Sequence, residues 1–481
     1  MVKKLIFICI LLLLSLVVAH KPGLVAVVKK GIVDKVRDKY FTSLFDQLGH
    51  QSIPDIKSGD LKLTKITAEL SNDSPNNLQA SFKEDINAIN IDLKNTHIDV
   101  KVNWRYHKSI LTLKGSARIR GTLSDLGMNI VMQDTKDGDF TIPHINAKDM
   151  RVSISKNKIK LDFHCKGCPK PVESLISKAL KGKLVDEVQS QIKKQVPKQA
   201  NSIGNSVIKK TYPKTLNLYD NISLATALTS SIVVKSDHLE VPIDATFFPK
   251  SQGYNHSSEP IDIPHYNKDD PGEIMLFFSP YLAQTLAKTI DTEKLVYDFP
   301  LFEIQHQLSI DPEAGPTVIS FEDGDLIAKG NAKIMAPVYG VGVSIGVTLK
   351  LDMNILNGEG DNMLSVIPKV KGLELEKFDF ITPKGSPSDS GIPASFIKSL
   401  LTSHVGLVGL SNNSNFETPR IDSKELLAYL NKLIPMFLDQ LVLPTVEIPQ
   451  QDILPLQVTN SELDFHKGYS ELGLLFKFTG Y

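Results

Sequence analysis

The sequence predicts an α+β protein made of two similar domains, and three observations lead to this fold class. Long stretches alternate apolar and polar residues with a period of two, which is typical of antiparallel strands. Other stretches space their apolar residues by three and four, which is typical of amphipathic helices. The order of helix, strands, long helix and strands occurs once in each half of the 481-residue chain.

In the first half, residues 24–48 carry a wide apolar stripe at helical spacing, so we expect a long helix there. Residues 53–163 then alternate with a period of two, which predicts an antiparallel meander. A second long helix is expected over residues 169–207, with a kink at Pro197. Two or three strands toward Phe248 complete this half.

The second half repeats this order after a linker, residues 249–272, that is rich in proline and glycine. We expect a strand from Ile274, a helix over 280–290, strands over 300–382 and a long helix over 423–441. Further strands end the chain.

A match in spacing also favours internal duplication. Phe248 follows Ser231 at the same distance at which Phe478 follows Ser461, and the two segments are offset by 230 residues. That offset is nearly the length of one half.

The two halves carry opposite net charge, although the whole chain is neutral. Residues 20–248 hold 35 Lys and Arg against 24 Asp and Glu, a net charge of +11. Residues 249–481 hold 17 against 30, a net charge of −13. We therefore expect a basic N-terminal domain over 20–248 and an acidic C-terminal domain over 273–481. A basic domain points to a polyanion, which is nucleic acid, an anionic membrane surface or a phosphorylated glycolipid.

Residues 1–19 have the pattern of a signal peptide, with Lys3 and Lys4 before an apolar run of 14 residues and Ala19 at the cleavage point. The run is too short for a membrane anchor and no later run is long enough, so no transmembrane segment is expected. We expect a secreted protein, or one in the lumen of a lysosome or phagosome, and this route argues against nucleic acid. Open sequons predict glycosylation at Asn221, Asn255 and Asn412.

Two cysteines, Cys165 and Cys168, remain after removal of the signal peptide. A local disulfide is the expected state in an oxidising compartment. A thioredoxin-like redox pair would need a βαβ context, which the pattern does not show, and two cysteines alone do not make a zinc site. We expect no metal and no cofactor.

Neither of two motif-like segments indicates an enzyme. Gly342-Val-Ser344-Ile-Gly346 fits the nucleophile elbow of an esterase, but Ser344 lies inside a continuous alternation where a strand–turn–helix would be needed. The acidic segment 134–139 lacks the spacing and the closing Glu of a calcium loop, so we interpret it as a turn.

Four segments resemble the family of bactericidal/permeability-increasing protein and lipopolysaccharide-binding protein. The resemblance covers nearly the whole mature chain, with the segments in the same order. They are Pro22-Gly-Leu-Val-Ala-Val-Val-Lys-Lys-Gly-Ile, then Trp104-Arg-Tyr-His-Lys through Leu113-Lys-Gly-Ser, then His144-Ile-Asn with Val152-Ser-Ile-Ser-Lys-Asn-Lys, and finally Leu441-Val-Leu-Pro, Leu454-Pro-Leu and Leu474-Leu-Phe-Lys-Phe.

This resemblance implies an elongated boomerang of two similar domains, each a curved antiparallel sheet wrapped on a long helix, joined by a central sheet. It also implies an apolar pocket for phospholipid acyl chains in each half and a basic N-terminal tip that contacts lipopolysaccharide. Vertebrate relatives clamp the first domain with a disulfide whose positions fall here near Thr141 and Val185, where no cysteine occurs. The pocket candidates on the first helix are Leu24, Val25, Val28 and Ile32.

Basic residues surround Trp104, and this arrangement suits a membrane interface because an indole lies at head-group level while cations contact phosphates. An ordinary solvated strand face is the alternative for any single cluster. The candidates for binding anionic head groups are Lys101, Trp104, Arg105, Lys108, Lys114, Lys156, Lys158 and Lys160.

We therefore expect a secreted, non-enzymatic lipid-binding protein that recognises lipopolysaccharide or another anionic membrane surface and acts in antibacterial defence. The alternative is a phospholipid or neutral-lipid transfer protein without a bacterial target.

Overall fold

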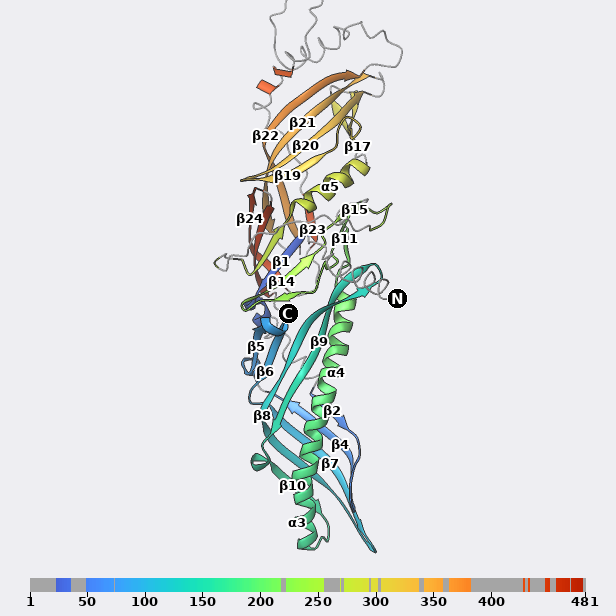
Figure 1. Cartoon of the computed structure of the whole chain (residues 1–481), viewed down its shortest axis with the longest axis vertical. Coiled ribbons are helices and arrows are strands. Elements are labelled where there is room, and N and C mark those ends of the chain that lie inside the picture. Colours follow the sequence, from blue (N-terminus) through green and yellow to red (C-terminus); the bar gives the residue numbers. More distant parts are fainter. Residues whose placement is uncertain are drawn as a thin grey trace, which may run out of the picture.

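The computed structural model describes 23–35, 49–72, 74–217, 222–254, 269, 272–293, 296–301, 304–336, 341–357, 363–381, 427–428, 431–432, 446–449, 456–467 and 469–478. The chain is elongated, with antiparallel sheets at the lower end, the centre and the upper end of Figure 1. This combination of sheets and helices confirms the α+β class. The signal peptide, most of the linker over 249–272 and most of the helix over 423–441 lie outside the described residues.

A sheet of nine described strands forms the lower half in Figure 1. Its order is β2-β4-β7-β8-β6-β5, with β3 on β4 and with β9 and β10 on β8. Antiparallel pairing throughout confirms the antiparallel strands predicted from the period of two. The prediction of a simple meander is wrong, because β4 pairs with β7 and β6 pairs with β8. The strands are β2 His50–Ile53, β3 Ile56–Ser58, β4 Leu61–Ser71, β5 Leu78–Lys83, β6 Ala88–Leu93, β7 His97–Lys108, β8 Leu111–Asp137, β9 Phe140–Ile154 and β10 Lys160–Cys165, with 3₁₀ turns at η1 Pro75–Asn77, η2 Glu84–Ile86 and η3 Lys156–Lys158.

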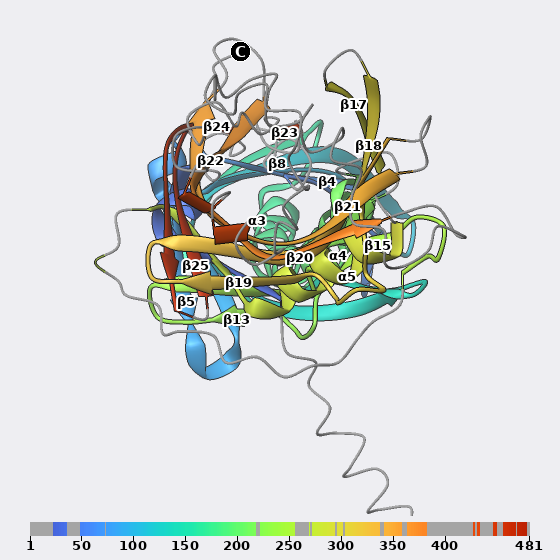
Figure 2. The ribbon, with the colours of Figure 1, turned by 90° about the horizontal axis from the view of Figure 1, so that it is seen from above.

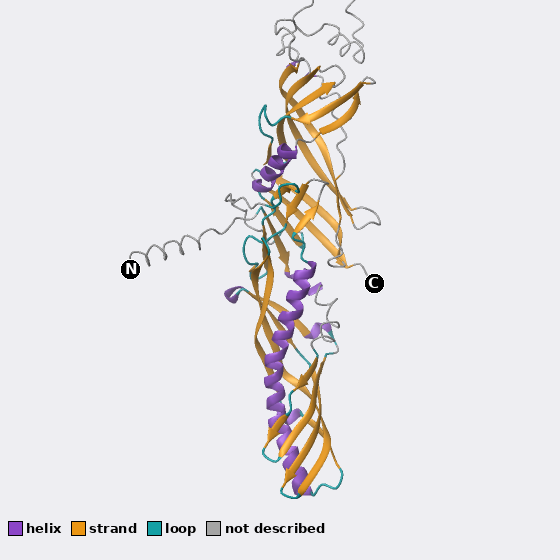
Figure 3. Cartoon of the chain, turned by 90° about the vertical axis from the view of Figure 1, so that its right-hand side faces the viewer, coloured by secondary structure: helices purple, strands orange, loops and turns teal. Residues whose placement is uncertain are grey.

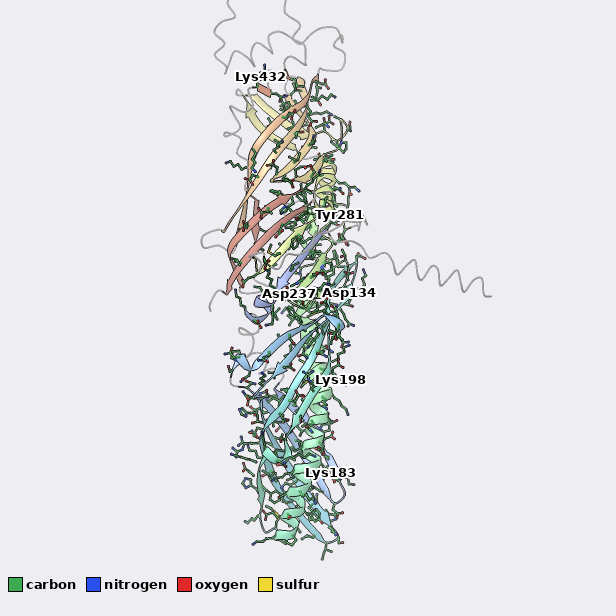
Figure 4. The ribbon with its side chains drawn as sticks, turned by 60° about the vertical axis from the view of Figure 1, so that its left-hand side comes forward. Asp134, Lys183, Lys198, Asp237, Tyr281 and Lys432 are labelled. Atoms are coloured by element: carbon green, nitrogen blue, oxygen red, sulfur yellow. A yellow bond between two sulfur atoms is a disulfide. The ribbon has the colours of Figure 1, made fainter. Side chains whose placement is uncertain are left out.

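The long helix predicted over 169–207 is present as three successive pieces. These are α3 Lys170–Ala179, the π-helical turn η4 Leu180–Leu184, and α4 Val185–Thr211, which contains Pro197. Figure 3 shows the helix running along the strands, and Figure 2 shows the sheets curving around it. Lys183 and Lys198, labelled in Figure 4, mark its course.

The main core lies between this helix and the concave face of the sheet. Ile176, Leu180, Leu184, Val188 and Ile192 are spaced by four residues and are all but fully buried. They pack against apolar side chains from β4, β7, β8 and β9. Since each buried aliphatic side chain contributes about 1.5–3 kcal/mol, this stripe is what holds the helix to the sheet.

Amide side chains of α4 also bind the open edge of β9. Asn205 accepts a hydrogen bond from the Ile145 N–H at 2.8 Å and donates to the Ile145 carbonyl at 2.9 Å. Asn201 likewise accepts a hydrogen bond from the Ala147 N–H at 2.5 Å and donates to the Ala147 carbonyl at 3.4 Å. Each Asn thus substitutes for one residue of a neighbouring strand, and the unpaired backbone groups of the edge are satisfied.

The same bond pair occurs in the C-terminal half. Asn431 accepts from the Leu375 N–H and donates to the Leu375 carbonyl, both at 2.8 Å. Asn201 and Asn431 are 230 residues apart, which is also the offset between Phe248 and Phe478.

The central sheet combines strands from both halves, in the order β13-β14-β1-β16-β25-β24. The strand of this sheet that comes first in the sequence, β1, pairs with β14 on one side and β16 on the other. The strands are β1 Leu24–Lys29, β13 Val233–Val234, β14 His238–Ile243, β16 Ile274–Phe278, β24 Leu456–His466 and β25 Tyr469–Phe478.

The helix expected from residue 24 onward is therefore wrong over Leu24–Lys29. Helical structure covers residues 30–35, and residues 36–48 lie outside the described part. A central strand is buried on both faces and appears in the sequence as a continuous apolar run, which periodicity does not separate from a buried helix. The β-branched residues Val25, Val27 and Val28 are the signal that favours a strand.

The upper part of Figure 1 contains a sheet of seven described strands, covered in part by α5 Pro280–Glu293, where a helix was predicted. Ser344 lies inside this sheet, paired with Lys333 and Asp379, so it is not at a nucleophile elbow. The strands are β17 Val296–Leu301, β18 Ile304–Ile310, β19 Val318–Glu322, β20 Asp325–Ala336, β21 Val341–Asn357, β22 Met363–Ile381 and β23 Val446–Pro449, and a small sheet joins β11 Thr215–Asn217, β12 Ile222–Ala225 and β15 Phe247–Pro249.

Replacing Asn201 with alanine should lower the free energy of unfolding by about 1–3 kcal/mol, because the N–H and C=O of buried Ala147 lose their partner. Urea unfolding measures this loss. Ser202→Ala, on the exposed side of the same helix, is the control and should leave stability unchanged. Equal behaviour of the two variants would show that the Asn bonds do not fasten α4.

Candidate functional site

Three cations lie directly opposite one another on the outer face of the N-terminal sheet. Lys62 on β4 pairs in register with Arg105 on β7, and Arg105 pairs with Lys114 on β8. All three side chains are exposed. Their neighbours in sequence, Leu63 on β4 and Trp104 and Tyr106 on β7, point inward. We call Lys62, Arg105 and Lys114 the cationic row.

Little opposing charge compensates the cationic row. Lys62 forms an exposed ion pair with Asp55 at 3.2 Å. Arg105 and Lys114 form no ion pair with any described residue, and no Asp or Glu occurs in the sequence between Asp99 and Asp125. Like charges opposite one another on neighbouring strands destabilise a sheet by up to about 1 kcal/mol per pair. The row therefore costs stability unless it binds an anion.

Two arginines further along β8, Arg118 and Arg120, are neutralised within the protein. Arg118 donates from Nε to both oxygens of Asp99 at 2.9 Å, and Arg120 bonds Asp162 at 2.5 Å. The bond from Arg118 holds the pKa of the Asp99 carboxyl below its ordinary value. These two arginines therefore differ from Arg105 and Lys114, which lie nearer the β7–β8 turn and form no ion pair with a described residue.

The structure divides the predicted head-group residues into two groups. Lys101, Arg105, Lys108 and Lys114 are exposed on the β7–β8 hairpin. Lys156, Lys158 and Lys160 lie apart from Arg105, Lys108 and Lys114, because Lys160 is opposite Arg120, about 20 Å along β8 from Lys114. Lys156 is also paired with Asp186 at 2.7 Å. The sequence did not reveal Lys62 as a neighbour of Arg105, since that contact depends on β4 pairing with β7.

Trp104 does not lie where a membrane-facing indole would. It is 2% exposed, and its ring stacks on Phe163 with centroids 5.0 Å apart. Its Nε1–H has no hydrogen-bond partner within the described structure. The prediction of an indole at head-group level is therefore wrong for this conformation. The alternation of β7 explains why, because Val102, Trp104 and Tyr106 share the inner face.

Cys165 and Cys168 form the predicted disulfide, which links the last residue of β10 to the loop before α3. In β10, Cys165 lies opposite Gly115. The sequons Asn221, Asn255 and Asn412 fall outside the described residues, so glycosylation stays a prediction.

The predicted pocket residues Leu24, Val25 and Val28 lie on β1 and not on a helix. Val25 packs with Val27, Met275 and Phe277, whereas Val28 packs with a different cluster that includes Phe82. These residues therefore do not form one continuous stripe. Ile32 is buried in the following helical segment. Contact of these residues with lipid stays a prediction.

Within the described part of the chain, no group of His, Cys, Asp or Glu side chains could hold a metal ion. The acidic segment 134–139 contains the β8–β9 turn, as predicted, and Asp137 pairs there with Lys209 and Lys214. No described helix is both long and apolar enough to cross a membrane.

Comparisons with known proteins give likeness in structure alone. No family model matches the sequence, and no curated protein matches it. The crystal structure of lipopolysaccharide binding protein is similar, with 14% identity, coverage of 96% of this chain and 100% of that chain, and a TM-score of 0.47. P47 of Clostridium botulinum E1 covers 95% of this chain and 99% of its own at 9% identity and a TM-score of 0.32. P47 from Clostridium botulinum A2 covers 95% and 97% at 10% identity and a TM-score of 0.29.

Gly115→Ala should destabilise the N-terminal half by about 1–3 kcal/mol. A Cβ at Gly115 would lie 2.1 Å from the His164 carbonyl oxygen and 2.6 Å from Trp104 Cζ2. Because Trp104 is the only tryptophan, its fluorescence during urea unfolding reports on this core. Gly182→Ala meets no atom within 4 Å and is the control, expected to be neutral or stabilising. An unchanged midpoint for Gly115→Ala would contradict the close packing of Trp104.

Asp99→Asn should reduce stability at pH 7, because Arg118 loses its carboxylate partner. The folded-state pKa of Asp99 is lowered, so its contribution is present above the unfolded pKa and is lost as pH falls through the folded value. The stability difference between wild type and variant should therefore shrink below about pH 4. Urea unfolding at pH 7, 4 and 3 measures it, and a constant difference would exclude this ion pair as its source.

Proposed function

We propose that this protein binds anionic lipid through the exposed hairpin face of its N-terminal half, and that lipopolysaccharide is its ligand. The observation that carries the proposal is the cationic row of Lys62, Arg105 and Lys114. Phosphate groups of a lipid head group would supply the negative charge that this part of the protein lacks. Each cation near an anionic surface contributes about 1 kcal/mol, so a few together suffice for docking.

We also propose the two similar domains that the family resemblance implies, each with an apolar site for phospholipid acyl chains. The recurrence of one Asn–strand bond pair at Asn201 and Asn431 supports this, as does a central sheet built from both halves. The boomerang arrangement stays a prediction.

Secretion, or residence in a lysosomal or phagosomal lumen, and a role in antibacterial defence complete the proposal. They rest on the signal-peptide pattern and on the anionic character of bacterial surface lipid. The absence of a recognisable catalytic motif in the sequence favours a binding protein over an enzyme.

The double variant Arg105→Gln, Lys114→Gln should bind lipopolysaccharide about 30-fold more weakly than wild type at low salt, because two surface cations are lost. Wild-type affinity should fall with added salt, and the variant's should fall less steeply. Titration of labelled protein with lipopolysaccharide at two salt concentrations measures both quantities.

Lys193→Gln, Lys194→Gln is the matched control, since it removes two exposed cations from α4 and none from the cationic row. Equal loss in both double variants would mean that total charge, and not the row, governs binding. Co-purified phospholipid without lipopolysaccharide binding would favour the alternative function in lipid transfer.

A further inference from the structure

The β7–β8 hairpin projects beyond its neighbouring strands. β4 accompanies β7 only to Tyr106, and β10 accompanies β8 only to Gly115. The last pair of the hairpin is Lys108 with Leu111, joined by the turn residues Ser109 and Ile110. Ile110 is five positions from Gly115, so the turn lies about 17 Å beyond the end of β10. Figure 1 shows this region at the lower end of the molecule, near α3.

The turn carries one apolar side chain that is fully exposed, and a second, partly exposed apolar side chain follows it. Ile110 is 101% exposed, and Leu111 is 39% exposed. Two-residue hairpin turns favour Asn, Asp and Gly, partly because a positive φ is needed, and here Ser109 has φ 53°. An isoleucine at this tip makes no contact that would stabilise the fold, and it exposes a large apolar side chain to water. Single exposed apolar residues are common on proteins, so exposure of Ile110 alone does not indicate a binding role, and the residues around it must be considered.

Basic residues lie at defined distances from the apolar tip, measured along the hairpin. Lys108 lies directly opposite Leu111, so it is one residue below Ile110, about 3 Å along the hairpin, and Lys114 is four residues below Ile110, about 13 Å. The polar layer on each side of a bilayer is about 5–8 Å thick. With Ile110 at the boundary of the hydrocarbon, the backbone of Lys108 would therefore lie within the polar layer, from which its ammonium group can extend to the phosphates, and Lys114 would lie at the outer surface. Long basic side chains reach such a level readily.

We infer that the hairpin tip is a membrane wedge, in which Ile110 enters the acyl region of an anionic bilayer while Lys108 and the cationic row bind its phosphates. The positive charge around an apolar tip selects a negatively charged lipid surface over a neutral one. This inference rests on the proposed function, because the cationic row must first hold the protein at the surface. Burial of the apolar tip adds a contribution to the binding free energy that salt does not screen.

Full-length Ile110→Ser tests the wedge on vesicles of equal parts phosphatidylglycerol and phosphatidylethanolamine. At high salt, where the cationic row is screened, its binding should be about tenfold or more weaker than wild type, because the buried side chain is lost. The dependence of its affinity on salt should match that of wild type. Val207→Ser is the control, since Val207 on α4 is also exposed, at 53%, and lies far from the tip.

Depth is measured independently with Ile110→Cys carrying an environment-sensitive dye. We expect a blue shift on these vesicles, quenching by lipid with a nitroxide on the acyl chain, and protection from iodide. If iodide still quenched the dye on vesicles, and Ile110→Ser bound like wild type, the membrane-wedge inference would be wrong. If Arg105→Gln, Lys114→Gln still bound weakly in that case, the proposed function would stand without the wedge. If wild type bound neither these vesicles nor lipopolysaccharide, both would fail.

Discussion

The N-terminal half depends on one constraint, which is that its curved sheet has a single apolar face and the helix from Lys170 to Thr211 must cover it. Every strand that contributes to this core must place alternate residues inward. On β7 the inward set includes Val102, Trp104 and Tyr106, so Lys101 and Arg105 are directed outward. The cationic face is thus a geometric consequence of the core, and the pairing of β4, β7 and β8 aligns its charges.

Much of this could be predicted from local pattern. The alternation over 53–163, the long helix after Pro169 and the Cys165–Cys168 disulfide all depend on residues close in sequence, and the structure has all three. The role of Trp104 was accessible by the same reasoning. Its neighbours alternate strictly, and that pattern places the indole inside, whereas its basic surroundings suggested the opposite.

What local pattern could not supply is long-range pairing. Leu24–Lys29 is apolar on both sides because it is enclosed by two strands, and nothing within the segment identifies them. Likewise Lys62 and Arg105 are 43 positions apart in the sequence, and only the register of β4 on β7 makes them neighbours. The Asn201 and Asn431 bonds are also invisible in advance, because a helical Asn ordinarily indicates a solvated face or a cap.

The position of β1 also constrains how the molecule can be assembled. This strand is made first, yet both of its partners, His238–Ile243 and Ile274–Phe278, are more than 200 residues further along the chain. During synthesis the backbone N–H and C=O groups of β1 have no strand to pair with until those segments exist, so the central sheet closes late and over a large loop. The N-terminal sheet and its helix can form before that, because the core that they share contains only residues before 212. The strand that joins the two halves, β1, is therefore synthesised early but can pair only after most of the N-terminal half has folded.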